Sequence, residues 1–431
     1  MQQNNVPAAQ YNKKRSFLLS GLPYFIMAHA AHHFLLALAQ PLLPSIRSYF
    51  KIDSYLGASV IPMAYALASA TGQLPAGWAA DKFGPTLLIM IGTLGVAVAG
   101  ILIGLSHSLV MFIICLVLMG LLAGGYHPAA TPLISASVDP KIRGRALGFH
   151  LVGGNSAFFV APLVAAVVIG IFGPDNGWRY SYLVLAVPTL VFGIIFYRFL
   201  TKHGGKTYVE TAKRSAIVEK APQPGYKRRL VAFLTMMVIG GGFTMSVIPL
   251  LTLYMTDKLG ASDAVAGGLM SIVYSSGLWA GPVSGFIAEK IGSVKIIIFT
   301  GLCSGLIIFG FNHVSLGWSL YLLLFAQGLN NALRMPVTEL FIMSQAPGKH
   351  RSKIFGVYYS TMQYTGAIFV LPGAFLIDKF GWEVMFNVAA IGVSSIALIT
   401  AFFIFDGKDN YQGELVQSTE DEADLRKKVI K

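Results

Sequence analysis

Three histidines fall within five residues of a long apolar run near the start of the chain. His29, His32 and His33 occupy positions i, i+3 and i+4, so they share one face of a helix. Histidine is the side chain whose unperturbed pKa, about 6.5, lies nearest to physiological pH. Such a group can carry protons, bind a solute, hydrogen-bond neighbouring helices or ligate a transition metal. We favour a proton or solute site, and the sequence leads us to predict no metal site and no cofactor.

Further polar side chains interrupt apolar runs along the rest of the chain. They are Tyr126, His127, His150, Asn155, Asn330, Asn331, Arg334, Glu339, Gln363 and Tyr364. Arg334 is always charged and binds carboxylate or phosphate groups in bidentate fashion. It either binds an anionic solute or forms a structural pair with another helix. Pairing with Glu339 on the same helix is poor, because residues five apart point about 140° from each other. We predict that Tyr126, His127, Asn155, Asn331 and Arg334 bind solute or protons together with the three clustered histidines.

The composition indicates that these residues lie in a membrane protein. The chain has 431 residues, of which 55% are hydrophobic and 12% charged, whereas soluble domains carry roughly 25% charged residues. Twelve apolar stretches are long enough to span a bilayer as helices. They are Ser16–Leu43, Ser54–Ala80, Pro85–Leu105, Leu109–Ser135, Gly144–Phe172, Tyr180–Leu200, Leu230–Met255, Ala264–Ala288, Val294–Phe311, Leu316–Met343, Ser352–Ile377 and Met385–Phe405. We expect the first to be retained rather than cleaved as a signal peptide, because its apolar run continues past Ala28-His29-Ala30.

The net charge of +13 indicates how the chain is oriented in the membrane and does not indicate nucleic-acid binding. With both termini in the cytoplasm, Arg334 lies within a helix and nearly all other basic residues fall on the inner side. The outer ones are Arg47, Lys51, Arg179, Lys258 and Lys379. This is the positive-inside distribution of a multi-pass protein of the bacterial inner membrane. The basic inner surface also favours contact with anionic membrane lipids.

The two halves of the chain repeat each other at an offset of 208 residues. GWAADKFG at 77–84 matches GFIAEKIG at 285–292, QPLL at 40–43 matches IPLL at 248–251, and KIRGRALG at 141–148 matches KHRSKIFG at 349–356. The halves hold six helices each, so they insert in the same orientation. We predict a first bundle at residues 1–200, a basic cytoplasmic linker at 201–229 and a second bundle with a cytoplasmic tail at 230–431.

With this repeat, the chain resembles the major facilitator superfamily over essentially its whole length. The resemblance rests on Gly77, Asp81, Lys82 and Gly84, on their echo Gly285, Glu289, Lys290 and Gly292, and on the basic loop with Arg143 and Arg145. It implies an all-α membrane fold of twelve transmembrane helices in two six-helix bundles that rock about a central cavity. Pro85 and Thr86 replace the two basic residues that usually follow the loop. Within this resemblance Gly77, Asp81, Lys82, Gly84, Arg143, Arg145, Glu289 and Lys290 form a cytoplasmic gate, with an ordinary solvated loop as the alternative.

Proline and glycine predict a hinge in the fourth helix. Proline removes a backbone hydrogen bond and kinks a helix, and Pro128 follows Gly120, Gly124 and Gly125. The repeat places Pro336 at the equivalent position. We therefore expect symmetric kinks, with a histidine beside only one of them.

A closer resemblance, to the fosmidomycin-resistance-type branch, rests on three short elements. These are the histidines of the first helix, the stretch from Gly124 to His127-Pro128, and Gly153-Gly154-Asn155 followed by Pro162. Members of that branch export small, often anionic or amphiphilic compounds in exchange for protons. The branch commonly has Asn-Asp where this chain has His32-His33, so the usual carboxylate proton carrier is missing.

These observations predict a secondary transporter for a small organic solute, working as a monomer by proton-coupled export. A phosphate-binding G-x-x-x-x-G-K-[ST] loop is absent from the sequence, which argues against an ATP-driven pump or an enzyme. One alternative is an importer of a nutrient or metal chelate. Another is a copper transporter that uses the histidines with Met27, Met236, Met237 and Met335 as ligands. A receptor that does not transport is a third possibility.

Overall fold

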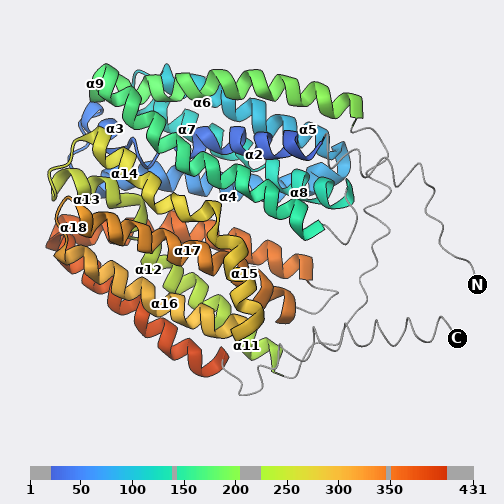
Figure 1. Cartoon of the computed structure of the whole chain (residues 1–431). Coiled ribbons are helices and arrows are strands. Elements are labelled where there is room, and N and C mark those ends of the chain that lie inside the picture. Colours follow the sequence, from blue (N-terminus) through green and yellow to red (C-terminus); the bar gives the residue numbers. More distant parts are fainter. Residues whose placement is uncertain (1–20, 138–142, 204–224, 346–350, 405–431) are drawn as a thin grey trace, which may run out of the picture.

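The computed structural model describes residues 21–137, 143–203, 225–345 and 351–404, which form helices joined by short turns (Figure 1). The first half contains α2 (Leu22–Leu36), α3 (Leu43–Tyr49), α4 (Tyr55–Phe83), α5 (Pro85–Met90), η1 (Ile91–Gly95), α6 (Val96–Gly104), α7 (Leu109–Ala123), α8 (Tyr126–Ser137) and α9 (Arg143–His203). The second half contains α11 (Tyr226–Thr235), η3 (Met236–Gly240), α12 (Gly241–Met245), η4 (Ile248–Leu250), α13 (Leu251–Asp257), α14 (Asp263–Ser275), η5 (Ser276–Leu278), α15 (Ala280–Ile291), α16 (Ser293–Gly310), η6 (Phe311–His313), α17 (Trp318–Gln345) and α18 (Arg351–Ile404).

Six stretches of the described chain are long and apolar enough to cross a membrane by length and composition alone. Two of them are helical hairpins, because α9 reverses at Gly173 and α18 reverses at Gly381. Both glycines have positive φ values, 72° and 84°, a conformation that side chains with a Cβ rarely adopt. The remaining spans are formed by α2, α4, α14 with α15, and α17. The fold is thus twelve transmembrane helices in two six-helix bundles, as the sequence predicts.

Structural equivalence at the 208-residue offset extends beyond the matched motifs. Gly173 and Gly381 stand at this offset, and each turns one hairpin. Gly84 and Gly292 also stand at this offset, with φ values of 91° and 89°. Each ends a helix by donating its N–H to a carbonyl four residues earlier. The repeat therefore fixes backbone conformation at loops as well as helix count.

The first helix of each half ends earlier than its apolar run. α2 ends at Leu36, and a turn leads through Pro41 into α3. In the second half α12 ends at Met245 and η4 contains Pro249. Proline disfavours the helical conformation in the residue before it, so the matched QPLL and IPLL sequences bend both helices. The prediction of one continuous span through Leu43 was wrong for this reason, and its start at Ser16 lies outside the described residues.

The expected symmetric kinks at Pro128 and Pro336 are replaced by an asymmetric break. The break falls at Gly124 and Gly125, and Pro128 sits in the first turn of α8, where its missing N–H costs no helical hydrogen bond. α17 runs through Pro336 without interruption. The two adjacent glycines in the first half provide the difference, because glycine is a weak helix former.

The two halves pack against each other along α9 with α14 and along α4 with α18. We call the end at which α9 finishes and α11 begins the linker end, and the opposite end the far end. In Figure 1 the first half, coloured blue to green, lies above the second half, coloured yellow-green to red. The Arg47–Asp257 ion pair joins the two halves at the far end. There Ser45 also donates to Asp263 at 2.7 Å. These contacts hold the far end of the two halves together.

Candidate functional site

The three histidines of α2 meet two further histidines from other helices. His29, His32 and His33 project from one face of α2 toward His127 of α8 and His150 of α9. The His29 and His150 rings stack with their centroids 4.1 Å apart. His29, His32 and His150 are each at most 3% exposed. The structure therefore gathers five imidazoles in the interior of the first half.

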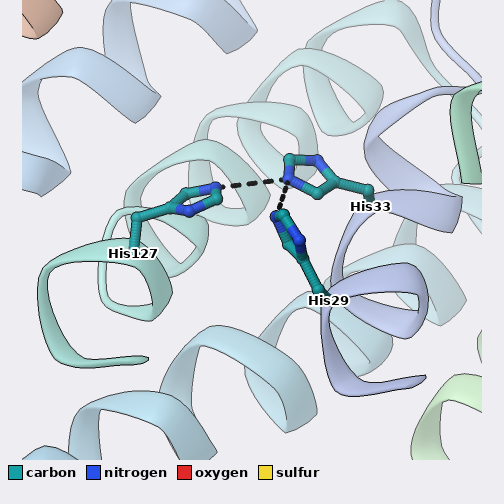
Figure 2. Close-up of side chains that lie close together, drawn as sticks. All are labelled: His29, His33 and His127. Carbon is teal, nitrogen blue, oxygen red and sulfur yellow. Dashed lines mark hydrogen bonds between the residues drawn. The ribbon is translucent and has the colours of Figure 1, made fainter. Parts of the chain in front are cut away.

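Three of these imidazoles approach one another through the same ring atom. His29 Nε2 lies 3.1 Å from His33 Nε2, and His127 Nε2 lies 3.2 Å from the same His33 atom. Figure 2 shows the three rings with their nitrogens turned inward, two from α2 and one from α8. We call His29, His33 and His127 the histidine triad.

Backbone carbonyls define the tautomers of the surrounding histidines. His29 Nδ1 donates to the carbonyl of His150 at 2.7 Å, and His150 Nδ1 donates to that of Phe25 at 3.1 Å. His32 Nδ1 donates to the carbonyl of Gly92 at 2.7 Å. Because a carbonyl only accepts, each Nδ1 carries the hydrogen and each neutral ring keeps a lone pair on Nε2. Gly92 lies in η1, a π-helical segment of the kind often found at functional sites.

Two glycines of α9 allow this close approach of helices. A Cβ on Gly153 would lie 2.1 Å from the carbonyl oxygen of Ile26, and one on Gly154 would lie 2.6 Å from Cε1 of His29. Neither distance is compatible with a side chain. The Gly153-Gly154 pair thus brings α9 against α2 and seats the His29 ring.

Tyr126 packs its ring against the histidine cluster. Its ring stacks on His32 at a centroid distance of 4.6 Å and on His29 at 5.6 Å. The side chain is fully buried, and its hydroxyl donates to the carbonyl of Phe25 at 3.4 Å. We therefore interpret Tyr126 as a packing element of the histidine cluster.

Arg334 occupies the position in the second half that Tyr126 occupies in the first. Its Nη2 donates to Met237 Sδ at 3.2 Å, and Met237 is the repeat equivalent of His29. Thioether sulfur is a weak acceptor, and the Arg334 Nε is buried without a hydrogen-bond partner. Among the described side chains no carboxylate forms an ion pair with it. The guanidinium therefore retains most of its capacity to bind an anion.

The other polar residues of α17 have partners of their own. Glu339 accepts from the hydroxyl of Tyr359 at 2.6 Å, in agreement with the expectation that it does not pair with Arg334. Asn331 accepts from Gln327 at 3.1 Å, one turn earlier on the same helix. Asn330 donates to Ser304 at 2.7 Å and so ties α17 to α16.

Asn155 reaches the interface between the halves and not the histidine cluster. Its Nδ2 donates to the carbonyl of Gly277 at 2.7 Å. Gly277 belongs to η5, where the helix formed by α14 and α15 is interrupted, so its carbonyl is not taken by a regular helical bond. Asn155 thus links α9 to the second half.

Only part of the predicted gate can be described. The side chains of Asp81, Arg143, Arg145 and Glu289 lie outside the described ones. Lys82 lies over the ring of Trp78 at 4.8 Å, and Lys290 lies over that of Phe286 at 4.4 Å. These pairs are equivalent in the repeat, so both loops hold their lysine by the same cation–π contact. The gate itself stays a prediction, with Gly77 inside α4 and Gly84 at its end.

The methionines do not support a mixed histidine and methionine copper site. Met236 and Met237 belong to the buried core of the second half. Met27 and Met335 are 56% and 51% exposed. The histidine triad is therefore formed without the four methionines named as candidate ligands.

The paired bundles and the polar groups within them define an integral, multi-pass membrane transporter, and comparisons with known proteins place it in a family. The chain belongs to the Major Facilitator Superfamily, whose sequence profile matches residues 25–247 and 231–423. The fold resembles the inward-open xylose transporter XylE from E. coli, with a TM-score of 0.70 and 15% identity over 93% of this chain and 99% of that one. It also resembles a peptide transporter POT mutant solved with sulfate, with a TM-score of 0.74 and 16% identity over 91% and 97% of the two chains.

Its relatives by sequence include bacterial multidrug resistance proteins. The chain is 28% identical over 316 residues to MdtG of Proteus mirabilis (strain HI4320), which covers 72% of this chain and 76% of that protein. It is 28% identical over 327 residues to MdtG of Enterobacter lignolyticus (strain SCF1), with coverage of 75% and 77%. These findings make the protein a secondary transporter of small molecules. Its place in the fosmidomycin-resistance-type branch stays a prediction.

Sequence reasoning left two contributors out of the site. His150 was recognised as polar within the fifth helix, but nothing in its spacing connects it to His29. Gly92 contributes only a carbonyl, and no side-chain pattern reveals it. A signal existed for His150, because Gly153 and Gly154 lie one turn away on the same helix and mark the place where another helix approaches.

Proposed function

We propose that the protein exports a small organic solute, anionic or amphiphilic, across the bacterial inner membrane by alternating access in exchange for protons. In this proposal it works as a monomer with both termini in the cytoplasm. Its partners are the solute, protons and the surrounding membrane lipids.

The guanidinium of Arg334, which forms no ion pair with any described carboxylate, carries the proposal for an anionic solute. A buried cation without a carboxylate partner is costly, because its desolvation is not repaid by Coulomb attraction. Arg334 is donor-rich, lies in the middle of α17, and is bonded only to a sulfur among the described groups. A carboxylate or phosphate on the solute would satisfy several of its donors at once.

The proposed direction, export, takes account of the closed far end and of the relatives. The contacts made by Arg47 with Asp257 and by Ser45 with Asp263 bind the halves there. The distribution of basic residues predicts that the linker end lies in the cytoplasm. In this orientation the closed far end lies on the outer side of the membrane, an arrangement that exporters and importers share, so the proposed direction rests on the relatives. The names of the MdtG relatives, multidrug resistance proteins, agree with this direction.

Glu339 supports proton coupling. A carboxyl group within a membrane helix commonly belongs to a proton relay. Glu339 is half-buried and accepts a hydrogen bond from Tyr359. Its ionisable neighbours among the described residues are Tyr358 and Tyr359 of α18, and Tyr358 also lies near Arg334. Loss or gain of one proton on Glu339 would change the local charge beside the proposed anion site.

A transport assay with matched solutes tests this function. The purified protein is reconstituted in proteoliposomes, and uptake of organic anions and of their neutral amides is measured with and without an imposed pH gradient. Arg334→Gln should weaken binding of the anion by roughly 30–150-fold while leaving a neutral analogue within about threefold, because one charge-assisted bidentate contact is worth roughly 2–3 kcal/mol. Arg334→Lys should retain part of the affinity, since it keeps the charge and loses the fork geometry.

Two results would overturn the proposal. Equal losses for the anion and the neutral analogue would make Arg334 a structural residue. Net movement toward the cytoplasm, driven by inward proton flow, would replace export by the importer alternative. Thermal unfolding of each variant serves as the control for folding.

A further inference from the structure

Hydrogen bonding alone does not satisfy the histidine triad. Nε2 of His33 lies within hydrogen-bond distance of two other Nε2 atoms, those of His29 and His127. A neutral ring nitrogen carries either one hydrogen or one lone pair, so His33 Nε2 can make only one directed bond of the two. The other His33 nitrogen, Nδ1, is buried and has no partner. The arrangement therefore leaves buried polar capacity unused, which is unfavourable in a packed interior.

His29 has the hydrogen-bond pattern of a metal ligand. Its Nδ1 donates to the backbone carbonyl of His150, which leaves the Nε2 lone pair directed at the other two rings. Metal-binding histidines almost always donate their second ring nitrogen in this way, and the bond fixes the tautomer and raises the basicity of the ligating atom. The packing of Gly154 against the ring fixes its position further.

Two of the nitrogen–nitrogen separations within the triad are close to those around a bound ion. Ligand nitrogens at 2.0–2.1 Å from a tetrahedral zinc ion lie about 3.3–3.4 Å apart. The two measured separations are 3.1 and 3.2 Å, and the three ligand atoms all lie within 4.8 Å of one another. Small rotations of three side chains would place an ion among them.

We propose that His29, His33 and His127 bind one divalent transition-metal ion of the zinc type through their Nε2 atoms. Neutral imidazole is a preferred ligand of Zn²⁺, Cu²⁺ and Ni²⁺, and three protein ligands leave the fourth tetrahedral position open. No carboxylate or thiol of the described residues joins the group. The charge of the ion is therefore uncompensated by the protein, and an anion such as hydroxide or chloride takes the fourth position. This proposal does not depend on the identity or direction of the transported solute.

Binding is tested on the purified full-length protein in detergent after treatment with a chelator. Zinc is titrated in competition with a chromophoric chelator, and bound metal is counted by mass spectrometry after gel filtration. We expect one ion for each chain with a dissociation constant below micromolar. Co²⁺ bound in its place should show the intense visible absorption of a tetrahedral site.

Variants of the triad are compared with a histidine that is close but not a ligand. His33→Gln and His127→Gln should each weaken zinc binding by more than the roughly 10–100-fold that loss of a second-shell partner costs. His32→Gln is the matched control, because His32 lies on the same face of α2 but its Nδ1 is bonded to Gly92. It should bind zinc within about threefold of the unaltered protein.

The proposal fails if the unaltered protein binds no zinc at micromolar free metal. It also fails if binding survives in the variant that lacks all three triad histidines, or if the cobalt spectrum is that of an octahedral ion. The cobalt measurement needs no substitution, so it decides the matter even where a variant unfolds.

Discussion

Gln40 and Ile248 occupy equivalent positions in the two halves and are joined by a hydrogen bond, donated by Nε2 of Gln40 to the carbonyl of Ile248. They stand at the bends that QPLL and IPLL impose on the first helix of each half. Gln40 also accepts from the hydroxyl of Tyr274 at 2.7 Å. The repeat thus closes the far end by placing its own two bends in contact.

Replacement of Gln40 by Ala should favour opening of the far end. The change removes two side-chain hydrogen bonds to the second half, each worth about 0.5–1.5 kcal/mol, so the open population should rise several-fold. Spin labels at Lys51 and Lys258, both exposed at this end, report the distance in a background with Cys115 and Cys303 replaced by Ser. Ser59→Ala is the control, because its hydroxyl bonds only within α4. An unchanged distance distribution in Gln40→Ala would remove Gln40 from the closure.

Asp378 should act as a helix cap across the two halves. Its carboxylate accepts from the N–H groups of Tyr55 and Leu56 at 2.9 Å each, in the first turn of α4. A carboxylate there satisfies unpaired donors and complements the helix dipole. Asp378→Ala should cost about 0.5–2 kcal/mol and open the far end, while Asp378→Asn, which keeps one of the two acceptor oxygens, should open it less. The same spin labels measure both variants, and equal opening in the two would show that charge and not capping matters.

Gly154→Ala should damage the histidine cluster specifically. The new methyl group would overlap the His29 ring, and overpacking of a filled interior costs about 1–3 kcal/mol. We expect a lower unfolding temperature and weaker zinc binding. Gly170→Ala, on the same helix hairpin with no atom within 4 Å of the added carbon, should leave both properties unchanged or raise the stability. Undiminished zinc affinity in Gly154→Ala would mean that packing of residue 154 against the His29 ring does not affect zinc binding.

Glu339→Gln should uncouple transport from the pH gradient. Glutamine still accepts from Tyr359 but cannot release a proton, so solute exchange across the membrane should continue while accumulation driven by the pH gradient stops. Counterflow and gradient-driven uptake in the same proteoliposomes separate these two steps. Tyr359→Phe should have a smaller effect, because it removes the hydroxyl that donates to Glu339 and leaves the carboxyl group in place. Full coupling in Glu339→Gln would assign the proton to another group.

The sequence by itself determined the membrane fold, because each spanning helix must be apolar and must satisfy its own backbone. The 208-residue repeat also determined the two halves and anticipated the matched turns, since Gly84 and Gly292 need a conformation that only glycine adopts readily. The common face of His29, His32 and His33 followed from helical periodicity alone.

Only the tertiary structure decided which helices supply the residues that contact the three histidines of α2. His127 and His150 lie about a hundred residues or more from His29, and no local pattern encodes contacts between helices so far apart in the chain. The contacts depend on how closely α9 and α8 approach α2, which Gly153, Gly154 and the break at Gly124 and Gly125 set through packing. For the same reason Arg334 was visible in the sequence as a charge, but only the placement of its neighbours showed that no carboxylate among the described side chains pairs with it.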